Sequence, residues 1–273
     1  MDDQRLKKIA AFYDQKKVQS FLESVLETHF LHIGLYGDEE LSVDDASKAI
    51  LAKMLKLLPK VNKSTKFLEL GAGKGAGARF IVDQYGSKVD CVNISKVENK
   101  LHTKLNSAEE IYEQSIKILE GDFQDMLFEN ANYDFVLAQE SLLHSAEKEH
   151  VFRQITRALK PEGRLVLTEI MKTDNAEENN AFLLEKQGLI ELATLATYKR
   201  LARTNNLYTA YIREMPEELK NHALAVLNAL GTTKKKVTSA DQKFVSEICQ
   251  DTIDAVDKEQ LTWGILIFQK INT

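Results

Sequence analysis

The sequence predicts an α/β fold in which a mostly parallel sheet is covered by helices on both faces. Three observations support this prediction. Strand-like and helix-like periodicities alternate from residue 67 to residue 170, a glycine-rich turn joins the first strand to its helix, and turn signals stand between elements at Gly86, Asp122 and residues 161–163. Ligands bind beyond the carboxyl ends of strands in such a sheet, so the residues that follow the strands are the candidates for a site.

Apolar spacing and end signals predict the elements in order. Apolar residues recur near one helix face at 5–27 and at 45–58, where Pro59 ends the second helix. The core should follow as strand 67–70, helix 75–85, strand 88–94, helix 96–113, strand 116–119, a short helix or loop, strand 133–138, helix 147–159 and strand 163–170. After a polar loop and helical stretch at 174–200, we expect strand 208–213, helices 217–230 and 239–256, and a final strand 261–270.

The chain is predicted to form one domain over residues 1–273, with an N-terminal helical lid (1–60), a ligand-binding core (61–172) and a helical cap with further helices (173–260). A net charge of −5 disfavours a nucleic-acid partner, and no apolar run is long enough to span a membrane. The charged start is not a signal peptide, so we expect a cytoplasmic protein. Cys91 and Cys249 fit no zinc spacing and are expected to be core residues, and no metal site is predicted.

The turn after the first strand is the most informative segment: Phe67-Leu-Glu-Leu-Gly-Ala-Gly-Lys-Gly-Ala-Gly-Ala-Arg-Phe80. Gly71, Gly73 and Gly75 lack a Cβ, so the backbone can take positive φ and lie against a ligand. Glu69 would repel a phosphate and suits a cationic amino-acid group. An acid followed by Gly-x-Gly-x-Gly resembles motif I of S-adenosylmethionine (SAM) methyltransferases, whose ligand carries an ammonium and a sulfonium. The alternatives are a structural turn and an NAD-type loop.

Polar residues also follow the next two strands. Asn93 ends the second strand, where an amide can both donate to and accept from ribose hydroxyls, although it could instead cap the next helix. Gly121, Asp122 and Phe123 follow the third strand, where a carboxylate can accept from the adenine amine while the aromatic ring packs on the base. The alternative is a turn acid and a core aromatic. Together with Glu69, these positions predict a nucleoside bound across neighbouring strand ends.

Further segments along nearly the whole chain resemble one group of enzymes. The segments are His32-Ile-Gly-Leu-Tyr36, Glu69 to Phe80, Val89-Asp-Cys-Val-Asn-Ile-Ser95 with Asn99, Gln139-Glu-Ser-Leu-Leu-His-Ser145, Ala158-Leu-Lys-Pro-Glu-Gly163, Met171-Lys172 and Leu261-Thr-Trp-Gly264. They resemble sarcosine/dimethylglycine N-methyltransferases of glycine betaine synthesis. The first segment is also similar to one in phosphoethanolamine, tocopherol and sterol methyltransferases. The resemblance implies a Rossmann-like class I methyltransferase fold with an antiparallel last strand, N-terminal helices and an inserted helical cap. It also implies SAM as cofactor and S-adenosylhomocysteine (SAH) as product.

The resemblance carries the cofactor site, with Glu69, Gly71, Ala72, Gly73, Gly75, Asn93, Ile94, Asn99, Gly121, Asp122, Phe123 and Gln139 as its residues. The acceptor should be enclosed by residues 27–36, 139–144 and the cap 173–200, because these segments adjoin the strand ends and have no place in the SAM motifs. The candidate acceptor residues are His32, Tyr36, Glu140, His144, Met171 and Lys199. His144 and Tyr36 are the catalytic candidates, because a base near the amine favours its neutral form and histidine can titrate near neutrality. Alternatively, His144 caps a helix or fills the wall of the site.

The acceptor region departs from the family pattern. Glu27-Thr-His-Phe-Leu31 stands where betaine-forming members have Trp-Gly-Gly-Glu-Asp, Gln139-Glu140 replaces Gln-Asp, and Thr168-Glu-Ile-Met171 replaces Thr-Asp-Pro-Met. A carboxylate on the acceptor would need a cation, for which Lys172, Lys199 and Arg200 are candidates.

Three functions follow from these patterns. The first is SAM-dependent N-methylation of a small amine such as sarcosine or dimethylglycine. The second is C- or O-methylation of a larger apolar acceptor, and the third is SAM binding without catalysis. The oligomeric state is open.

Overall fold

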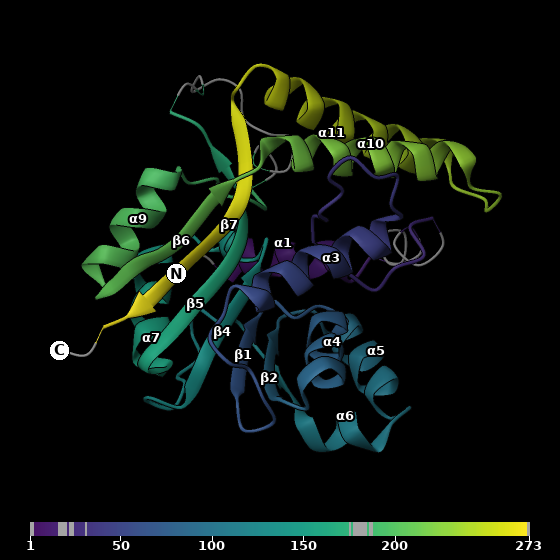
Figure 1. The fold of residues 1–273 in the computed structure, drawn as a ribbon. Helices are drawn as coiled ribbons and strands as arrows, with labels where there is room; N and C mark the ends of the chain where they lie inside the picture. Colours follow the sequence, from purple (N-terminus) through teal and green to yellow (C-terminus); the bar gives the residue numbers. More distant parts are fainter. Residues whose placement is uncertain are drawn as a thin grey trace.

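The computed structural model describes residues 3–15, 21, 25–30, 32–174, 176, 185 and 188–271. Its centre is a seven-stranded sheet in the order β3-β2-β1-β4-β5-β7-β6 (Figure 1). The strands are β1 Lys66–Leu70, β2 Lys88–Asn93, β3 Ile116–Glu120, β4 Tyr133–Gln139, β5 Leu159–Lys172, β6 Leu207–Glu214 and β7 Leu261–Lys270. β1 to β5 pair in parallel, whereas β7 is antiparallel to β5 and β6. The predicted mostly parallel sheet with an antiparallel last strand is confirmed.

Helices cover both faces of this sheet (Figure 1). The helices are α1 Asp3–Tyr13, α3 Val43–Lys56, α4 Ala76–Tyr85, α5 Lys96–Asn106, α6 Glu110–Ser115, the 3-10 turn η1 Leu142–His144, α7 Lys148–Ala158, α9 Leu195–Thr204, α10 Pro216–Thr232 and α11 Ser239–Asp257. One core joins the sheet to α3, α4 and α6, and a second joins it to α7 and α9. In β1, Phe67 faces the first core while Leu68 and Leu70 face the second, because side chains alternate along a strand. With both faces covered, the strand ends are left for a ligand.

Two expected helices are interrupted. The helix expected over residues 5–27 ends at Tyr13, and residues 16–20 and 22–24 lie outside the described part of the chain. The side chain of Asp14 turns to the start of α5, where its carboxylate accepts from the Ser95 hydroxyl (2.6 Å) and the Val97 N–H (3.3 Å). The helix expected over 96–113 splits into α5 and α6, because the backbone at Glu109 is extended (φ −142°).

The second half of the chain contributes to the same sheet. β6 and β7 extend it beyond β5, and α10 and α11 lie side by side at one end of the molecule (Figure 1). Much of the loop expected at 174–200 lies outside the described residues, so the division into lid, core and cap stays a prediction. Cys91 and Cys249 are buried free thiols, as expected. None of the described helices has the length and apolar character that crossing a membrane requires.

Candidate functional site

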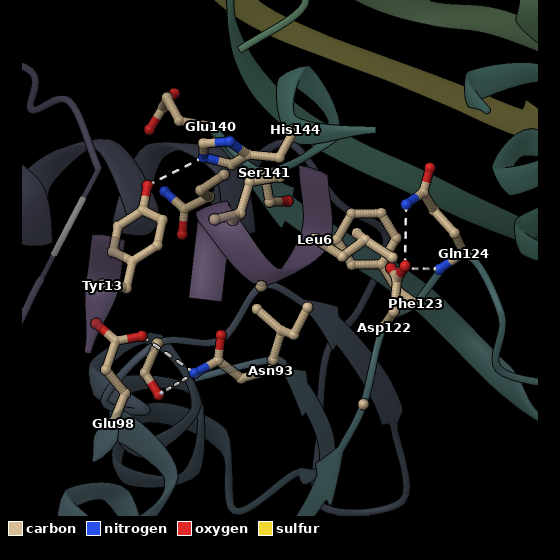
Figure 2. A pocket seen from close by; sticks show the side chains of 16 residues that line it. Leu6, Tyr13, Asn93, Glu98, Asp122, Phe123, Gln124, Glu140, Ser141 and His144 are labelled. Atoms are coloured by element: carbon tan, nitrogen blue, oxygen red, sulfur yellow. Dashed lines mark hydrogen bonds between the residues drawn. The ribbon is translucent and has the colours of Figure 1, made fainter. Parts of the chain in front are cut away.

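A pocket opens at the carboxyl ends of β1 to β4, where the sequence predicts the site (Figure 2). Its volume is about 700 Å³ when the open space at its mouth is included. This main pocket is lined by Leu6, Ile9, Tyr13, Gly71, Gly73, Asn93, Ile94, Glu98, Gly121, Asp122, Phe123, Gln124, Gln139, Glu140, Ser141 and His144. Residues predicted for the cofactor and for the acceptor therefore line one cavity.

A smaller pocket of about 380 Å³ shares Gly71, Gly73 and Gln139 with the main pocket. This side pocket is lined by His29, Phe30, His32, Glu69, Leu70, Gly71, Ala72, Gly73, Ala76, Gly77 and Gln139. It places the predicted residues Glu69, Ala72 and His32 beside the glycine turn. The turn thus forms a wall of both pockets.

The glycine turn needs glycine for two different reasons. Gly71, Gly73 and Gly75 all have positive φ, at +78°, +51° and +73°. A Cβ on Gly71 would lie 2.6 Å from the Cβ of Ser141, in the wall of the main pocket. A Cβ on Gly75 would overlap the ring of His102 on α5. Gly75 lines neither pocket, so its position in the structure serves the packing of α5 against the turn.

The N–H groups of this turn are largely used inside the protein. The N–H groups of Gly71 and Ala72 both donate to the carbonyl of Val92 (2.9 and 3.0 Å), and the N–H of Gly75 donates to that of Ala72 (2.8 Å). A phosphate cradle instead aims successive N–H groups at its anion. The hydrogen bonds within this turn therefore disfavour the alternative interpretation, in which the turn is an NAD-type loop that binds a pyrophosphate.

Glu69 is a buried carboxyl group on β1, next to the turn. Burial raises its pKa to about 7, against the opposing effects of a hydrogen bond from the Cys91 thiol (3.6 Å) and of the Arg79 charge. Its side chain lies so close to α4 that a Cβ on Gly77 would come within 2.5 Å of Oε1. Glu69 therefore faces both the start of α4 and the side pocket.

Asn93 works as part of a pair that the sequence did not reveal. Its Nδ2 donates to Glu98 Oε2 (3.1 Å), and Glu98 also lines the main pocket (Figure 2). Asn99 lines neither pocket; its Nδ2 donates to the carbonyl of Asn93 (3.1 Å) and so fixes the end of β2. Glu98 lies three residues after the N-cap Ser95, which is the spacing of a capping box. A capping role accounts for a glutamate at this position, so the sequence alone does not indicate that Glu98 lines a pocket.

Asp122 and Phe123 line the main pocket after β3, with Gly121 before them. The carboxylate of Asp122 accepts from the backbone N–H of Gln124 (2.9 Å) and from its Nε2 (3.0 Å), and burial raises the Asp122 pKa. Gln124 in turn accepts from the Ser145 hydroxyl (2.7 Å). Asp122 is thus both a turn acid and a pocket residue. Gln124, which sequence reasoning missed, joins this loop to the segment that follows η1.

The part of the main pocket next to η1 contains a hydrogen-bonded pair, His144 and Tyr13 (Figure 2). His144 Nδ1 lies 2.5 Å from the carbonyl of Leu189, which can only accept, so Nδ1 carries the proton. His144 Nε2 then accepts from the Tyr13 hydroxyl (3.0 Å). Burial lowers the pKa of His144 to about 4, a direction that the Arg5 charge reinforces. The expectation that His144 titrates near neutrality is wrong, because its ring is out of water.

Glu140 connects the pocket wall to the last strand. It follows β4 with φ +45°, and its carboxyl group accepts from Trp263 Nε1 on β7 (2.7 Å) and from the Ile33 N–H (3.1 Å). Burial raises the pKa of Glu140 to about 7. Glu140 therefore holds the segment 32–36 against the sheet in addition to lining the pocket.

Three predicted acceptor residues line neither pocket. Tyr36 is buried against α10, where its hydroxyl bonds His222 Nδ1 (3.0 Å). Met171 is fully buried in the second core, and Lys199 is exposed on α9. The other candidate cations pair elsewhere, Lys172 with Glu185 (2.7 Å) and Arg200 with Glu149 (3.6 Å).

The contribution of α1 was missed. Leu6, Ile9 and Tyr13 line the main pocket, and their helical spacing alone is indistinguishable from that of a core-facing stripe. Only the fold shows that this stripe, whose Ile9 also belongs to the first core, lines a cavity.

Some residues that line the pockets have buried polar atoms without a hydrogen-bond partner, and a polar ligand such as SAM fits these atoms. Both side-chain polar atoms of Gln139 and the hydroxyl of Ser141 are buried without a hydrogen-bond partner, and each belongs to a pocket-lining residue. Buried polar groups of this kind are normally paired, so a polar ligand accounts for them. Carboxyl groups that can accept hydrogen bonds also line the pockets, Glu98 and Asp122 in the main pocket and Glu69 in the side pocket.

The fold, the glycine turn and this pocket are those of a SAM-dependent methyltransferase. Residues 68–167 match the family described as a methyltransferase domain. The chain is 29% identical to the sarcosine/dimethylglycine N-methyltransferase of Aphanothece halophytica, over 95% of both chains, and 25% identical to that of Halorhodospira halochloris, over 98% of both. Among solved structures, a candidate sarcosine dimethylglycine methyltransferase from Galdieria sulphuraria has a TM-score of 0.85 and 28% identity, covering 94% of this chain and 99% of the other. The predicted resemblance to these enzymes is confirmed, and the protein is a methyltransferase with SAM as its cofactor.

Proposed function

We propose that this enzyme methylates the nitrogen of a small amino acid, with sarcosine and dimethylglycine as its acceptors. The observation that carries the proposal is the similarity, along at least 95% of both chains, to relatives named for these two substrates. The site residues of both ligands belong to the proposal. A cytoplasmic location and the lack of a nucleic-acid partner stay predictions.

The partly buried pair Tyr13 and His144 suits a neutral amine. When bound, SAM supplies an electrophilic methyl group on a sulfonium. The Tyr13 hydroxyl donates a hydrogen bond to His144 Nε2, and its oxygen is itself an acceptor suited to an amine N–H. A neutral amine becomes an ammonium when it is methylated, so the step needs no proton transfer. The low basicity of His144 is therefore compatible with the reaction.

Positioning is the main contribution that these residues can make. Alignment of reactants can supply up to ~7–11 kcal/mol of barrier reduction. Leu6 and Ile9 of α1 cover the main pocket, while Gln139 and Ser141 offer unpaired polar atoms to its ligands. Together they exclude water and restrict the orientation of a small acceptor.

The acceptor carboxylate needs a cation, and we assign this role to Arg5. Among the described residues that line the main pocket there is no lysine or arginine, and Arg5 precedes the lining residue Leu6 without lining either pocket itself. Arg5 on α1 lies close enough to His144 for its charge to lower the histidine pKa. Its Nη1 donates to Glu191 (3.2 Å), whereas Nε and Nη2 are buried and unpaired. These two atoms form one edge of the guanidinium, which can bind both oxygens of a carboxylate.

Incubation with methyl-labelled SAM and separate acceptors tests the function. Glycine, sarcosine, dimethylglycine and phosphoethanolamine should be compared at equal concentrations, with product identified by mass spectrometry. We expect methylated product from sarcosine and dimethylglycine. Product from phosphoethanolamine alone, or from none of the four, would contradict the proposal.

A further inference from the structure

Gln124 connects two parts of the pocket wall that come from separated strands. In the sheet, β2 and β1 lie between β3 and β4. The loop after β3 and the segment after β4 both contribute residues to the main pocket. Gln124 belongs to the first of these, is 8% exposed, and bonds residues 145 and 147 of the second. A single buried side chain thus joins two loops that the sheet itself holds apart.

The two ends of the Gln124 amide serve different loops. The backbone N–H of Glu147 lies 3.2 Å from the amide and can only donate, so Oε1 is the atom that faces it. Oε1 also accepts from the Ser145 hydroxyl (2.7 Å). Nε2 then points the other way and donates to Asp122 Oδ2 (3.0 Å; Figure 2). The accepting end therefore acts on the segment that carries His144, and the donating end acts on the carboxylate of Asp122.

Ser145 transmits the contact with Gln124 to its neighbour His144. It has no exposed surface, and its hydroxyl accepts from the Glu147 N–H (3.1 Å) while donating to Gln124. The carbonyl of Ser145 accepts from Lys148 Nζ (2.6 Å), and its N–H donates within η1. Every polar group of Ser145 is therefore bonded, which fixes the backbone of His144 from its carboxyl side.

The ring of His144 is held by contacts from other directions. Its Nδ1 bonds the carbonyl of Leu189, and its Nε2 accepts from the Tyr13 hydroxyl. The position of that hydroxyl in the pocket therefore depends on where the backbone of His144 lies. Misplacement of a reacting group by 1 Å can cost ~100-fold in rate, so loss of one anchor is enough to affect turnover.

We propose that Gln124 is a positioning residue for methyl transfer, which holds His144 and Tyr13 in register through Ser145 and holds the Asp122 carboxylate with its other end. The inference rests on the proposed function for the roles of Tyr13 and Asp122. Gln124 acts through these neighbours and needs no contact with the reacting atoms. Turnover and cofactor affinity are then controlled by opposite ends of one amide, so substitutions can separate them.

Three variants separate the two ends. Gln124→Met keeps the length of the side chain and removes both ends, whereas Ser145→Ala removes only a contact of Oε1. Gln124→Glu keeps an oxygen toward Ser145 but loses the donor and repels Asp122 when it is ionised, so all measurements are made at pH 8. Steady-state kinetics with sarcosine at saturating SAM gives kcat, and calorimetry gives the affinity for SAH.

We expect a crossed pattern. For Gln124→Met and Ser145→Ala, kcat should fall ~10-fold, whereas for Gln124→Glu it should stay within ~3-fold of the wild-type value. The SAH affinity should fall ~10-fold in Gln124→Met and Gln124→Glu and stay within ~3-fold in Ser145→Ala. A residue that only stabilised the fold would change kcat and SAH affinity together in all three variants.

Two further measurements test whether Gln124 acts through His144. In a Tyr13→Phe background, Gln124→Met should lower kcat by less than ~3-fold, because the hydroxyl that it positions is absent. Nitrogen-15 NMR of labelled histidines with SAH bound reports the Nδ1–H of His144, assigned by its loss in His144→Gln. This signal should shift in Ser145→Ala and keep its wild-type position in Gln124→Glu. The NMR measurement needs no acceptor, so it tests Gln124 independently of whether sarcosine is methylated.

The control is Gln154→Met, which changes another buried glutamine, on α7, that lines neither pocket. It should leave kcat and SAH affinity at their wild-type values, and thermal melting checks that each variant folds. Equal losses of kcat in Gln124→Met and Gln124→Glu would overturn the proposal. So would additive effects of Tyr13→Phe and Gln124→Met, or an unshifted His144 signal in Ser145→Ala.

Discussion

At the scale of single residues, the proposed binding of the acceptor carboxylate depends on the unpaired guanidinium edge of Arg5. Arg5→Lys keeps the charge but removes the paired Nε and Nη2 donors. For sarcosine, we expect KM to rise ~10- to 100-fold, the cost of losing charge-assisted hydrogen bonds. For N-methylethanolamine, which lacks the carboxylate, KM should change little. Steady-state kinetics with both acceptors measures the difference, and Lys8→Met, an exposed change on the same helix, is the control. A similar loss for both acceptors would contradict the role of Arg5.

For single residues, the sequence predicted which polar side chains lie at the pocket better than it predicted their hydrogen-bond partners. Asn93 and Asp122 could be placed because the ends of parallel strands must meet at one sheet edge. Glu98 was missed because its spacing from Ser95 is already explained by a helix cap. His144 was predicted at the site, but its pKa depends on burial and on the carbonyl of Leu189, which is 45 residues away along the chain.

At the scale of elements, α1 and the residue after it connect η1 and the segment at Glu191 with the start of α5. Tyr13 reaches His144, Arg5 reaches Glu191, and Asp14 reaches the start of α5. Propensity and periodicity predicted a helix here, but not where it ends. The side chain of Asp14 fixes that point, and its partner Ser95 lies 81 residues further on.

Tyr13→Phe tests the contribution of α1 to catalysis. The substitution keeps the ring, which packs edge-on against Phe12 and His144, and removes only the hydroxyl. We expect kcat to fall ~10-fold or more, because the amine loses an acceptor and His144 Nε2 loses its donor. SAH affinity by calorimetry should stay within ~3-fold of the wild-type value, since the ring still covers the pocket. A large loss of SAH affinity with unchanged kcat would show that the hydroxyl serves cofactor binding.

At the scale of the whole molecule, buried histidines and carboxyl groups oppose each other in the pH dependence of stability. The histidines whose pKa burial lowers, to about 3 or 4, are His32, His102, His144 and His222. Their neutral forms stabilise the fold above pH 6.5, and this stability is lost as the pH falls. The carboxyl groups whose pKa burial raises most are Glu69, Glu140 and Glu169. They are protonated in the fold and ionised when unfolded, so their contribution is lost as the pH rises from 4.5 toward 7.

We therefore expect a shallow decline in stability between pH 6.5 and 4.5, followed by a steep one. Between pH 6.5 and 4.5, the four histidines bind protons only in the unfolded state and the three carboxyl groups only in the folded state. The unfolded state therefore holds one more proton, and the free energy of unfolding falls by ~1.4 kcal/mol per pH unit. Below pH 4.5 the carboxyl groups no longer oppose the histidines. Urea unfolding at pH 6.5, 5.5, 4.5 and 4.0 measures this profile. Glu69→Gln should make the decline in stability between pH 6.5 and 4.5 about twice as steep, because one opposing carboxyl group is removed. A steep fall already at pH 6 in the wild type would show that the carboxyl groups do not oppose the histidines.

The order of the strands has a consequence for how the protein is made. β7 is the last strand along the chain, yet it lies between β5 and β6 in the sheet. During synthesis the amino-terminal part folds first, but β6 has no sheet neighbour until residues 261–270 leave the ribosome. Trp263, which anchors Glu140 at the pocket, arrives in the same segment. The strand ends of β1 to β4 can thus assemble early, whereas the contact of Trp263 with Glu140 at the pocket forms only after residues 261–270 have been synthesised.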